Sequence, residues 1–213
     1  MSYSVKEIFY TLQGEGANTG RPAVFCRFSG CNLWSGRERD RSNATCKFCD
    51  TEFVGTDGPR GGKFSDSASL VSIVVDTWKG KSSQSSSRMV VCTGGEPLLQ
   101  VDDGLVKRFH EEGFEVAVET NGTVDPPCGI DWICVSPKAG TELKLKSGNE
   151  LKLIYPQAGI SPEELEILDF ANFFVQPMDG PHITRNTELA IEFCLANPKW
   201  RLSLQTHKIV GIP

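Results

Sequence analysis

Three cysteines in the first quarter of the chain have the spacing and the surroundings of a metal-binding loop. Cys31, Cys46 and Cys49 form a C-x14-C-x2-C pattern among glycine, asparagine, arginine and aspartate residues. The two-residue gap between the last two cysteines lets both sulfur atoms bind one metal ion or cluster. The other cysteines lie in apolar runs, where free cysteine is a small buried residue, or beside prolines: Cys26, Cys92, Cys134 and Cys194 in the first group, and Cys128 in the second.

The spacing by itself leaves two kinds of metal centre open. A closed zinc site needs a fourth ligand, which another cysteine or a histidine would have to supply from a distant part of the chain: His110, His182 or His207. A [4Fe–4S] cluster held by three cysteines instead keeps one iron without a protein ligand, and that iron can bind a substrate or cofactor. We expect the thiols to be reduced, because a chain of 213 residues can build a core without disulfides.

The elements that must position these cysteines follow from short apolar runs separated by helical patterns. The runs predict strands over residues 23–28, 89–92, 114–118, 132–135, 151–155, 173–175 and 201–205. Apolar residues share one face of helices expected around residues 70–78, 101–109 and 189–194. This alternation predicts a parallel sheet. Seven strands with few clear helices predict an α/β fold with an incomplete or modified (β/α) barrel.

Single residues mark where helices and loops are expected. Pro97 suits the first position of a helix, Asn186 an N-cap, and Gly113 the position just after a helix ends. The longest irregular regions cover residues 30–62, which hold the three cysteines, and residues 79–88, where a run of serines indicates a solvated loop.

Polar and glycine-rich clusters directly follow five of the predicted strands, at residues 93–97, 119–122, 136–138, 176–179 and 205–208. Because the carboxyl ends of parallel strands meet at one edge of a sheet, these clusters predict one site there. Arg27 separates Cys26 and Phe28 in an otherwise apolar strand. A guanidinium on the inward side of such a strand could meet a substrate carboxylate.

The composition excludes several classes of protein. A net charge of −5 at pH 7 argues against a duplex-binding protein, whose affinity comes from neutralising phosphates. No apolar stretch approaches the ~18 residues of a membrane helix, and Glu7, Gln13 and Glu15 interrupt the region where a signal peptide has its apolar run. We therefore expect one cytoplasmic domain over residues 1–213 that acts on a small molecule, without direct contact to nucleic acid or membrane.

Nine segments together resemble the 7-carboxy-7-deazaguanine synthase family of the radical S-adenosylmethionine superfamily, in its subgroup with an enlarged cluster loop. The segments span nearly the whole chain, at residues 10–16, 25–28, 31–34, 48–51, 92–97, 119–122, 135–138, 175–179 and 205–207. Members of the superfamily usually space the cysteines C-x3-C-x2-C. The gap of fourteen residues departs from that pattern and enlarges the loop at about residues 30–62.

The resemblance implies a radical S-adenosylmethionine fold and a ring contraction, in which 6-carboxy-5,6,7,8-tetrahydropterin becomes 7-carboxy-7-deazaguanine with loss of ammonia, on the way to queuosine. It implies a [4Fe–4S] cluster on Cys31, Cys46 and Cys49, S-adenosylmethionine as cofactor, and Mg²⁺ bound at Thr51. No catalytic side chain is expected, because the cofactor carries the difficult step and the protein supplies orientation and exclusion of water.

The resemblance also assigns residues to the cofactor and to the substrate. The S-adenosylmethionine site would comprise Phe48, Cys49, Asp50, Gly94, Gly95, Glu96, Ser136, Pro137, Lys138, Gln176, Pro177, Met178 and Asp179. The pterin site would comprise Leu12, Gln13, Gly14, Glu15, Arg27, Thr93, Glu119, His207 and Pro213, with Asn121 as an alternative to Glu119. Each cluster also has a plain interpretation as a strand-end turn, and Pro213 as a frayed terminus.

Other functions remain open at this point. A protein-activating enzyme of the same superfamily would need an open groove for a peptide, whereas Gln13, Glu15 and Arg27 favour an enclosed polar pocket. A zinc-stabilised binding module would leave the strand-end clusters unexplained. The expected partners are the pterin and an external electron donor such as flavodoxin, and a homodimer is one option for the assembly.

Overall fold

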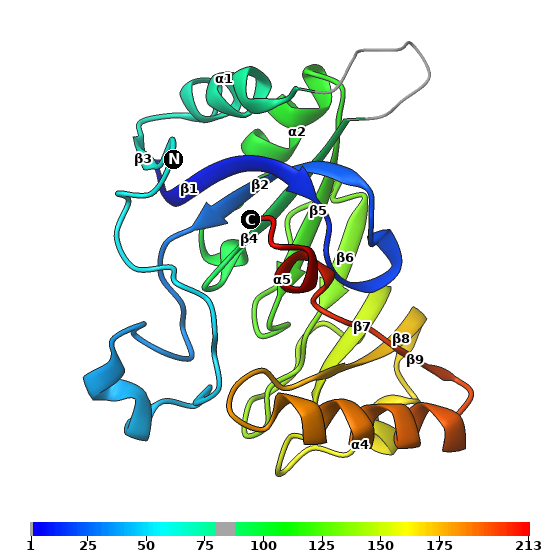
Figure 1. The fold of residues 1–213 in the computed structure, drawn as a ribbon. Helices are drawn as coiled ribbons and strands as arrows, with labels where there is room; N and C mark the ends of the chain where they lie inside the picture. The colour runs from blue at the N-terminus through cyan, green and yellow to red at the C-terminus, as the bar shows by residue number, and fades with distance from the viewer. Residues whose placement is uncertain (1, 80–87) are drawn as a thin grey trace.

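A curved nine-stranded β-sheet organises the protein in the computed structural model, which describes residues 2–79 and 88–213 (Figure 1). The strand order is β3-β1-β2-β4-β5-β6-β7-β8-β9, so β3 and β9 form two open edges. In chain order the strands are β1 (Tyr3–Leu12), β2 (Pro22–Phe28), β3 (Gly62–Phe64), β4 (Arg88–Gly94), β5 (Phe114–Thr120), β6 (Trp132–Val135), β7 (Ser147–Tyr155), β8 (Asp169–Pro177) and β9 (Trp200–Leu202). The serine-rich loop expected at residues 82–87 lies outside the described residues.

The parallel part of the sheet consists of β2 and β4 to β9, which correspond to the seven strands predicted from apolar runs. The α/β class and the incomplete barrel are therefore confirmed. The last predicted strand extends too far, because β9 ends at Leu202. Beyond it, the Ser203 hydroxyl donates to the side chain of Gln176 at 2.9 Å, and the chain then turns into a short helix.

Two antiparallel strands, β1 and β3, were not predicted. β1 pairs with β2 on one side and with β3 on the other. Its pairing register shifts between Val5 and Glu7, so a bulge at Lys6 interrupts the alternation of apolar and polar residues that marks a strand in a sequence. Lys6 is also buried. Its ammonium group pairs with Glu52 and Asp57 from the cysteine loop, which is the irregular region at residues 30–62.

The two faces of the parallel strands have different surroundings because successive side chains point in opposite directions. In β2, Val24, Cys26 and Phe28 belong to the large core, whereas Ala23 and Phe25 belong to a small apolar cluster on the other face. The large core lies between the sheet and the helices. The other face of the sheet, which we call the inward face, carries the small apolar cluster and, beyond it, the polar side chains of the strands.

The helices are α1 (Ser67–Thr77), α2 (Asp103–Glu111), α3 (Pro162–Leu165), α4 (Ile183–Ala196) and α5 (Thr206–Val210), with short 3₁₀ helices η1 (Gly16–Asn18), η2 (Glu38–Asn43) and η3 (Pro97–Leu99). The helices α1, α2 and α4 pack on the strands through the large core. Figure 1 shows the loop between β2 and β3 extending away from the sheet, and α5 lying near the C-terminus. None of the helices in the described residues is long and apolar enough to cross a membrane.

One of the three expected helix markers needs correction. Pro97 opens the 3₁₀ helix η3, as expected of the first position of a helix, and α2 begins further on, at Asp103. Asn186 lies inside α4, whose N-cap is His182, and its side-chain amide donates to the Met178 carbonyl at 2.8 Å. Gly113 follows the end of α2 with a φ of 74°, as expected of a residue that ends a helix.

Candidate active site

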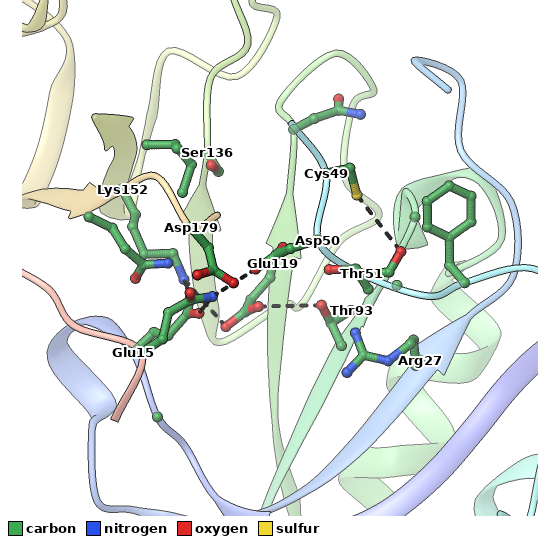
Figure 2. Close-up of a pocket in the computed structure, with 18 of the residues that line it drawn as sticks. Glu15, Arg27, Cys49, Asp50, Thr51, Thr93, Glu119, Ser136, Lys152 and Asp179 are labelled. Atoms are coloured by element: carbon green, nitrogen blue, oxygen red, sulfur yellow. Dashed lines mark hydrogen bonds and ion pairs between the residues drawn. The ribbon is translucent and has the colours of Figure 1, made fainter. Parts of the chain in front are cut away.

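The carboxyl edge of the parallel strands surrounds a cavity of about 370 Å³ (Figure 2). Most of the predicted site residues line it: Leu12, Gln13, Gly14, Glu15, Arg27, Cys31, Cys46, Phe48, Cys49, Asp50, Thr51, Thr93, Gly94, Gly95, Glu119, Ser136, Lys138, Gln176, Pro177, Met178, Asp179, His207 and Pro213. Glu96 and Pro137 do not form part of its wall. Polar clusters that are far apart in the sequence therefore face one cavity.

The cysteine loop forms one side of this cavity. Cys31, Cys46 and Cys49 are free thiols that line the same wall, and the backbone N–H of Leu33 donates to Cys31 Sγ at 3.4 Å. Burial raises the pKa of the Cys31 and Cys46 thiols. Burial therefore disfavours the thiolate form until a cation or an iron–sulfur cluster offsets its charge.

The donor chemistry of this wall suits a [4Fe–4S] cluster. Among the described residues, no group of three or more His, Cys, Asp or Glu side chains is arranged to hold a single metal ion. The three thiols nevertheless face one cavity, and the negative charge of the Cys49 thiolate adds to burial in raising the pKa of Cys31 and Cys46. A fourth protein ligand is not needed for a cluster whose remaining iron binds a cofactor.

Arg41 joins the two halves of the cysteine loop. Its Nη1 donates to the carbonyl oxygens of Lys47 at 2.9 Å and of Cys49 at 3.1 Å. Its guanidinium also lies 4.1 Å from the centre of the Trp34 ring, which belongs to the segment after the first cysteine. Arg41 lies within the fourteen-residue gap between Cys31 and Cys46, so the enlarged part of the loop supplies a residue that holds it together.

The glycines that follow β4 are required by close backbone packing. Gly94 has a φ of 137°, and a Cβ there would overlap the backbone of Phe28. A Cβ on Gly95 would overlap the carbonyl of Gly30, where the cysteine loop begins. These glycines let the end of β4 lie directly against the start of the loop.

Glu96 is fully buried next to this turn, and burial raises the pKa of its carboxyl. Its carboxylate accepts hydrogen bonds from the Thr120 hydroxyl at 2.8 Å and from the backbone N–H of Asn121 at 2.8 Å and of Leu98 at 3.0 Å. Its contacts in this structure hold η3 and β5 together, and its expected part in binding S-adenosylmethionine stays a prediction.

The opposite wall carries polar groups on strands. Glu119 accepts a hydrogen bond from the Gln13 amide at 3.0 Å and one from the Thr93 hydroxyl at 3.3 Å. Arg27 Nε pairs with Glu7 Oε1 at 2.8 Å. Figure 2 shows Arg27, Thr93 and Glu119 along one side of the cavity. Glu119 and Asn121 both line it, so the geometry does not choose between them as ligand contacts.

Lys152 also lines the wall but was not predicted, whereas Gln205 and Lys208 lie in the predicted cluster at residues 205–208 but had been given no role of their own. Lys152 lies in the apolar strand β7, so it carried the same sequence signal as Arg27: a charged residue within an apolar run. Lys208 Nζ lies 2.6 Å from both Asp50 and Asp179. It therefore ties the end of the cysteine loop to the end of β8, and its charge outweighs burial in lowering the pKa of Asp50.

Lys138 and His207 complete the wall. Lys138 Nζ donates to the carbonyl and the hydroxyl of Ser136 at 2.6 and 2.7 Å and lies 5.9 Å from the centre of the Phe48 ring. Burial lowers its pKa. His207 packs so closely on Gly14 that a Cβ there would overlap its ring. The Pro213 carbonyl accepts a hydrogen bond from the Thr11 hydroxyl at 3.0 Å.

Comparison with known proteins identifies the family. No family model matches the chain. It is 60% identical over 212 residues to the 7-carboxy-7-deazaguanine synthase of Bradyrhizobium diazoefficiens and 58% identical over 213 residues to that of Caulobacter vibrioides, with 100% of each chain covered. The crystal structure of QueE from Escherichia coli matches with a TM-score of 0.70 and 29% identity, over 96% of this chain and 94% of that one.

The open α/β sheet and the site at its carboxyl edge define an enzyme with a fold of the radical S-adenosylmethionine type. The identity to full-length relatives then makes the assignment specific. The chain belongs to the 7-carboxy-7-deazaguanine synthase family, which confirms the resemblance seen in its sequence.

Proposed function

We propose that this protein converts 6-carboxy-5,6,7,8-tetrahydropterin to 7-carboxy-7-deazaguanine and ammonia, in the biosynthesis of queuosine and related 7-deazapurines. The observation that carries the proposal is that three cysteines of one loop and a cluster of polar strand residues line the same cavity. A cavity of about 370 Å³ suits a small carboxylated heterocycle better than a peptide. A protein-activating role is therefore not favoured.

In this proposal Cys31, Cys46 and Cys49 hold a [4Fe–4S] cluster. When bound, the cluster with S-adenosylmethionine supplies the radical that removes a hydrogen atom from the substrate. The protein itself binds and orients the cofactor and excludes water from it. The expected cofactor contacts that line the cavity come from the ends of β4, β6 and β8 and from residues 48–50.

The pterin would bind against the opposite wall. Arg27 uses Nε for its pair with Glu7, so its two Nη nitrogens remain for two parallel hydrogen bonds to the substrate carboxylate. Gln13, Glu15 and Glu119 would bind the amino edge of the heterocycle, with His207 and Pro213 beside them.

A magnesium ion and an electron donor complete the proposal. Mg²⁺ keeps several waters and is seldom bound by protein groups alone, so one hydroxyl from Thr51 and the substrate carboxylate make a suitable ligand set. Thr51 lies on the cavity wall next to the cluster cysteines. An external one-electron donor such as flavodoxin would reduce the cluster.

The experiment is anaerobic reconstitution with iron and sulfide, followed by incubation with the pterin, S-adenosylmethionine and a reductant. We expect a product with the mass of 7-carboxy-7-deazaguanine and one ammonia per product. The matched control is the Cys31→Ala protein treated in the same way, which should form neither. A reconstituted native protein that cleaves S-adenosylmethionine but leaves the pterin unchanged would contradict the proposal.

A further inference from the structure

Lys152 lies at the centre of the polar wall, and its side chain is only 5% exposed. Its Nζ lies 2.5 Å from Glu15 Oε2 and 3.7 Å from Glu119 Oε1 (Figure 2). The two glutamates come from different parts of the chain, Glu15 from the segment after β1 and Glu119 from β5. One lysine therefore holds two carboxylates from separate elements on one side of the cavity.

The other groups that contact these carboxylates are neutral. Glu15 Oε1 accepts a hydrogen bond from the Gln205 amide at 2.9 Å, and Glu119 accepts from Gln13 and Thr93. Within residues 2–79 and 88–213, Lys152 is the one cation that lies within 4.0 Å of either glutamate. It therefore supplies the positive charge that compensates two partly buried carboxylates.

We propose that Lys152 is a positioning residue that keeps Glu15 as a carboxylate anion and holds Glu119 beside it facing the cavity, and so restricts that wall to ligands whose facing edge carries N–H donors. A carboxylate accepts hydrogen bonds and donates none, whereas a protonated carboxyl also donates. The aminopyrimidinone edge of a pterin presents such N–H donors. The identity of this ligand rests on the proposed function, but the ionised state of Glu15 does not.

Lys152 and the acidic groups around it each favour the charged form of the other. Burial alone would raise the pKa of Glu15, but the charge and hydrogen bond of Lys152 outweigh it, so the pKa is lowered. Burial alone would lower the pKa of Lys152, but the surrounding acidic groups raise it. The remaining titratable groups that face Lys152 or share its wall are Glu150 on β7, Cys134 on β6, Lys138 after β6 and His207 on α5.

The sign of the pH dependence follows from the lowered pKa of Glu15. A proton enters the native Glu15 only below its ordinary range, so the ionised form persists throughout neutral pH. Without Lys152, only the neutral amides of Gln205 and Gln176 would oppose burial, which raises the pKa of Glu15. As the pH falls, ligand binding should then weaken at a higher pH than in the native protein, and it should recover as the pH rises.

The test is infrared spectroscopy of the protein without substrate at pH 7, comparing the native protein with Lys152→Met. We expect an additional protonated-carboxyl band in Lys152→Met, absent from Lys152→Arg. The double variants Lys152→Met/Glu15→Gln and Lys152→Met/Glu119→Gln assign that band. If Lys152→Met gains no protonated carboxyl group, or the gained band persists in Lys152→Met/Glu15→Gln, the proposal is overturned.

Lys6 offers a matched control, because it is also a buried lysine that pairs with two carboxylates. Glu52 and Asp57 lie 2.9 and 2.8 Å from its Nζ, but their side chains are both 81% exposed. Water therefore keeps them ionised when the lysine is removed, and Lys6→Met should gain no protonated-carboxyl band at pH 7. If Lys6→Met gains the same band as Lys152→Met, the special role of Lys152 is refuted.

Two further measurements make the outcome decisive. If Lys152→Met does not fold, a pH titration of native protein against Glu15→Gln gives the answer, since protonation of native Glu15 above its ordinary range contradicts the proposal. If the native protein converts the pterin, Lys152→Met should lower kcat/KM about tenfold or more at pH 7 and less at higher pH. An equal loss at all pH values would contradict the proposal. Failure of the native protein to convert the pterin would refute the proposed function, while the infrared result would still decide the role of Lys152.

Discussion

The two sides of the cavity are built in different ways. On one side, the three thiols lie on an irregular loop, and Arg41 and Trp34 hold this loop together by contacts within it. On the other side, Glu119 and Lys152 project from strands that are hydrogen-bonded to their neighbours within the sheet. The thiols on the loop side need a bound group to offset the charge of their thiolate form. The carboxylates of Glu15 and Glu119 on the strand side are already paired with Lys152.

This difference indicates separate tasks for the two sides. Strand positions are fixed by the ladder and by the core beneath it, so they suit recognition of a rigid ligand. The cysteine loop has no such ladder, and its own side chains together with ion pairs from Lys6 and Lys208 fix it, so the order of the cysteine side depends more on what it binds. Variants on the loop should affect cluster content first, and variants on the strands should affect pterin kinetics first.

The largest effect is expected from removing a loop cysteine. Cys31→Ala, Cys46→Ala and Cys49→Ala should each fail to keep a full cluster, whereas the native protein should hold about four irons per chain after anaerobic reconstitution. Iron and sulfide analysis with absorption spectra measures this.

The controls are Cys26→Ala and Cys92→Ala, since both thiols are buried in the core between strands. They should retain the cluster. Loss of cluster in these variants together with retention in Cys31→Ala would reverse the assignment of the ligands.

The elements that the sequence predicted well are those in which local pattern and burial agree. The seven parallel strands are short, apolar and buried, so their runs stand out. β1 was missed because Lys6 sits in a bulge, and a buried lysine acquires its meaning from Glu52 and Asp57 in a distant loop. Local pattern cannot show a charge that is paired only by tertiary contacts.

The candidate site shows the same limit. The clusters at strand ends predicted a single cavity because topology alone brings them together. Lys152 was missed, since its partners Glu15 and Glu119 lie far away in sequence. Cys194 was expected to be buried in the core, but it is only partly buried, because α4 covers the sheet with one face and exposes the other.

On the strand side, Arg27→Ala should lower kcat/KM for the pterin by about 30-fold or more. Removing one partner of a charge-assisted pair from an enclosed site costs about 2–5 kcal/mol. The cluster and the uncoupled cleavage of S-adenosylmethionine should remain, because Arg27 does not belong to the loop. Steady-state kinetics with both assays measures the difference.

Arg21→Ala is a matched control, because Arg21 precedes the same strand and also pairs with a glutamate, Glu115, but does not line the cavity. It should leave pterin kinetics close to native. If both arginine variants lose pterin activity equally, Arg27 acts through the stability of β2 and not through the substrate.

Removal of Mg²⁺ should have a smaller effect, of about tenfold on pterin turnover, which corresponds to about 1.4 kcal/mol. Thr51→Ala should show a similar loss and little further response to added Mg²⁺. Thr45→Ala, an exposed threonine of the same loop, should respond to Mg²⁺ as the native protein does. Turnover that is independent of Mg²⁺ in the native protein would remove Thr51 from the proposed metal site.

The smallest effect is expected from Arg41, and it tests whether the loop is organised from within. Arg41 donates to two backbone carbonyls beside the cluster cysteines and covers Trp34, but its side chain is partly exposed, so these contacts are worth about 1 kcal/mol. Arg41→Met should therefore release iron to a chelator about fivefold faster than the native protein, with unchanged pterin KM. Arg39→Met is the control, since Arg39 is exposed and contacts only Asp40 among the described residues, at 3.6 Å. Equal rates of iron release in the two variants would show that Arg41 does not hold the loop, and a raised pterin KM in Arg41→Met would show that the two sides of the cavity are not independent.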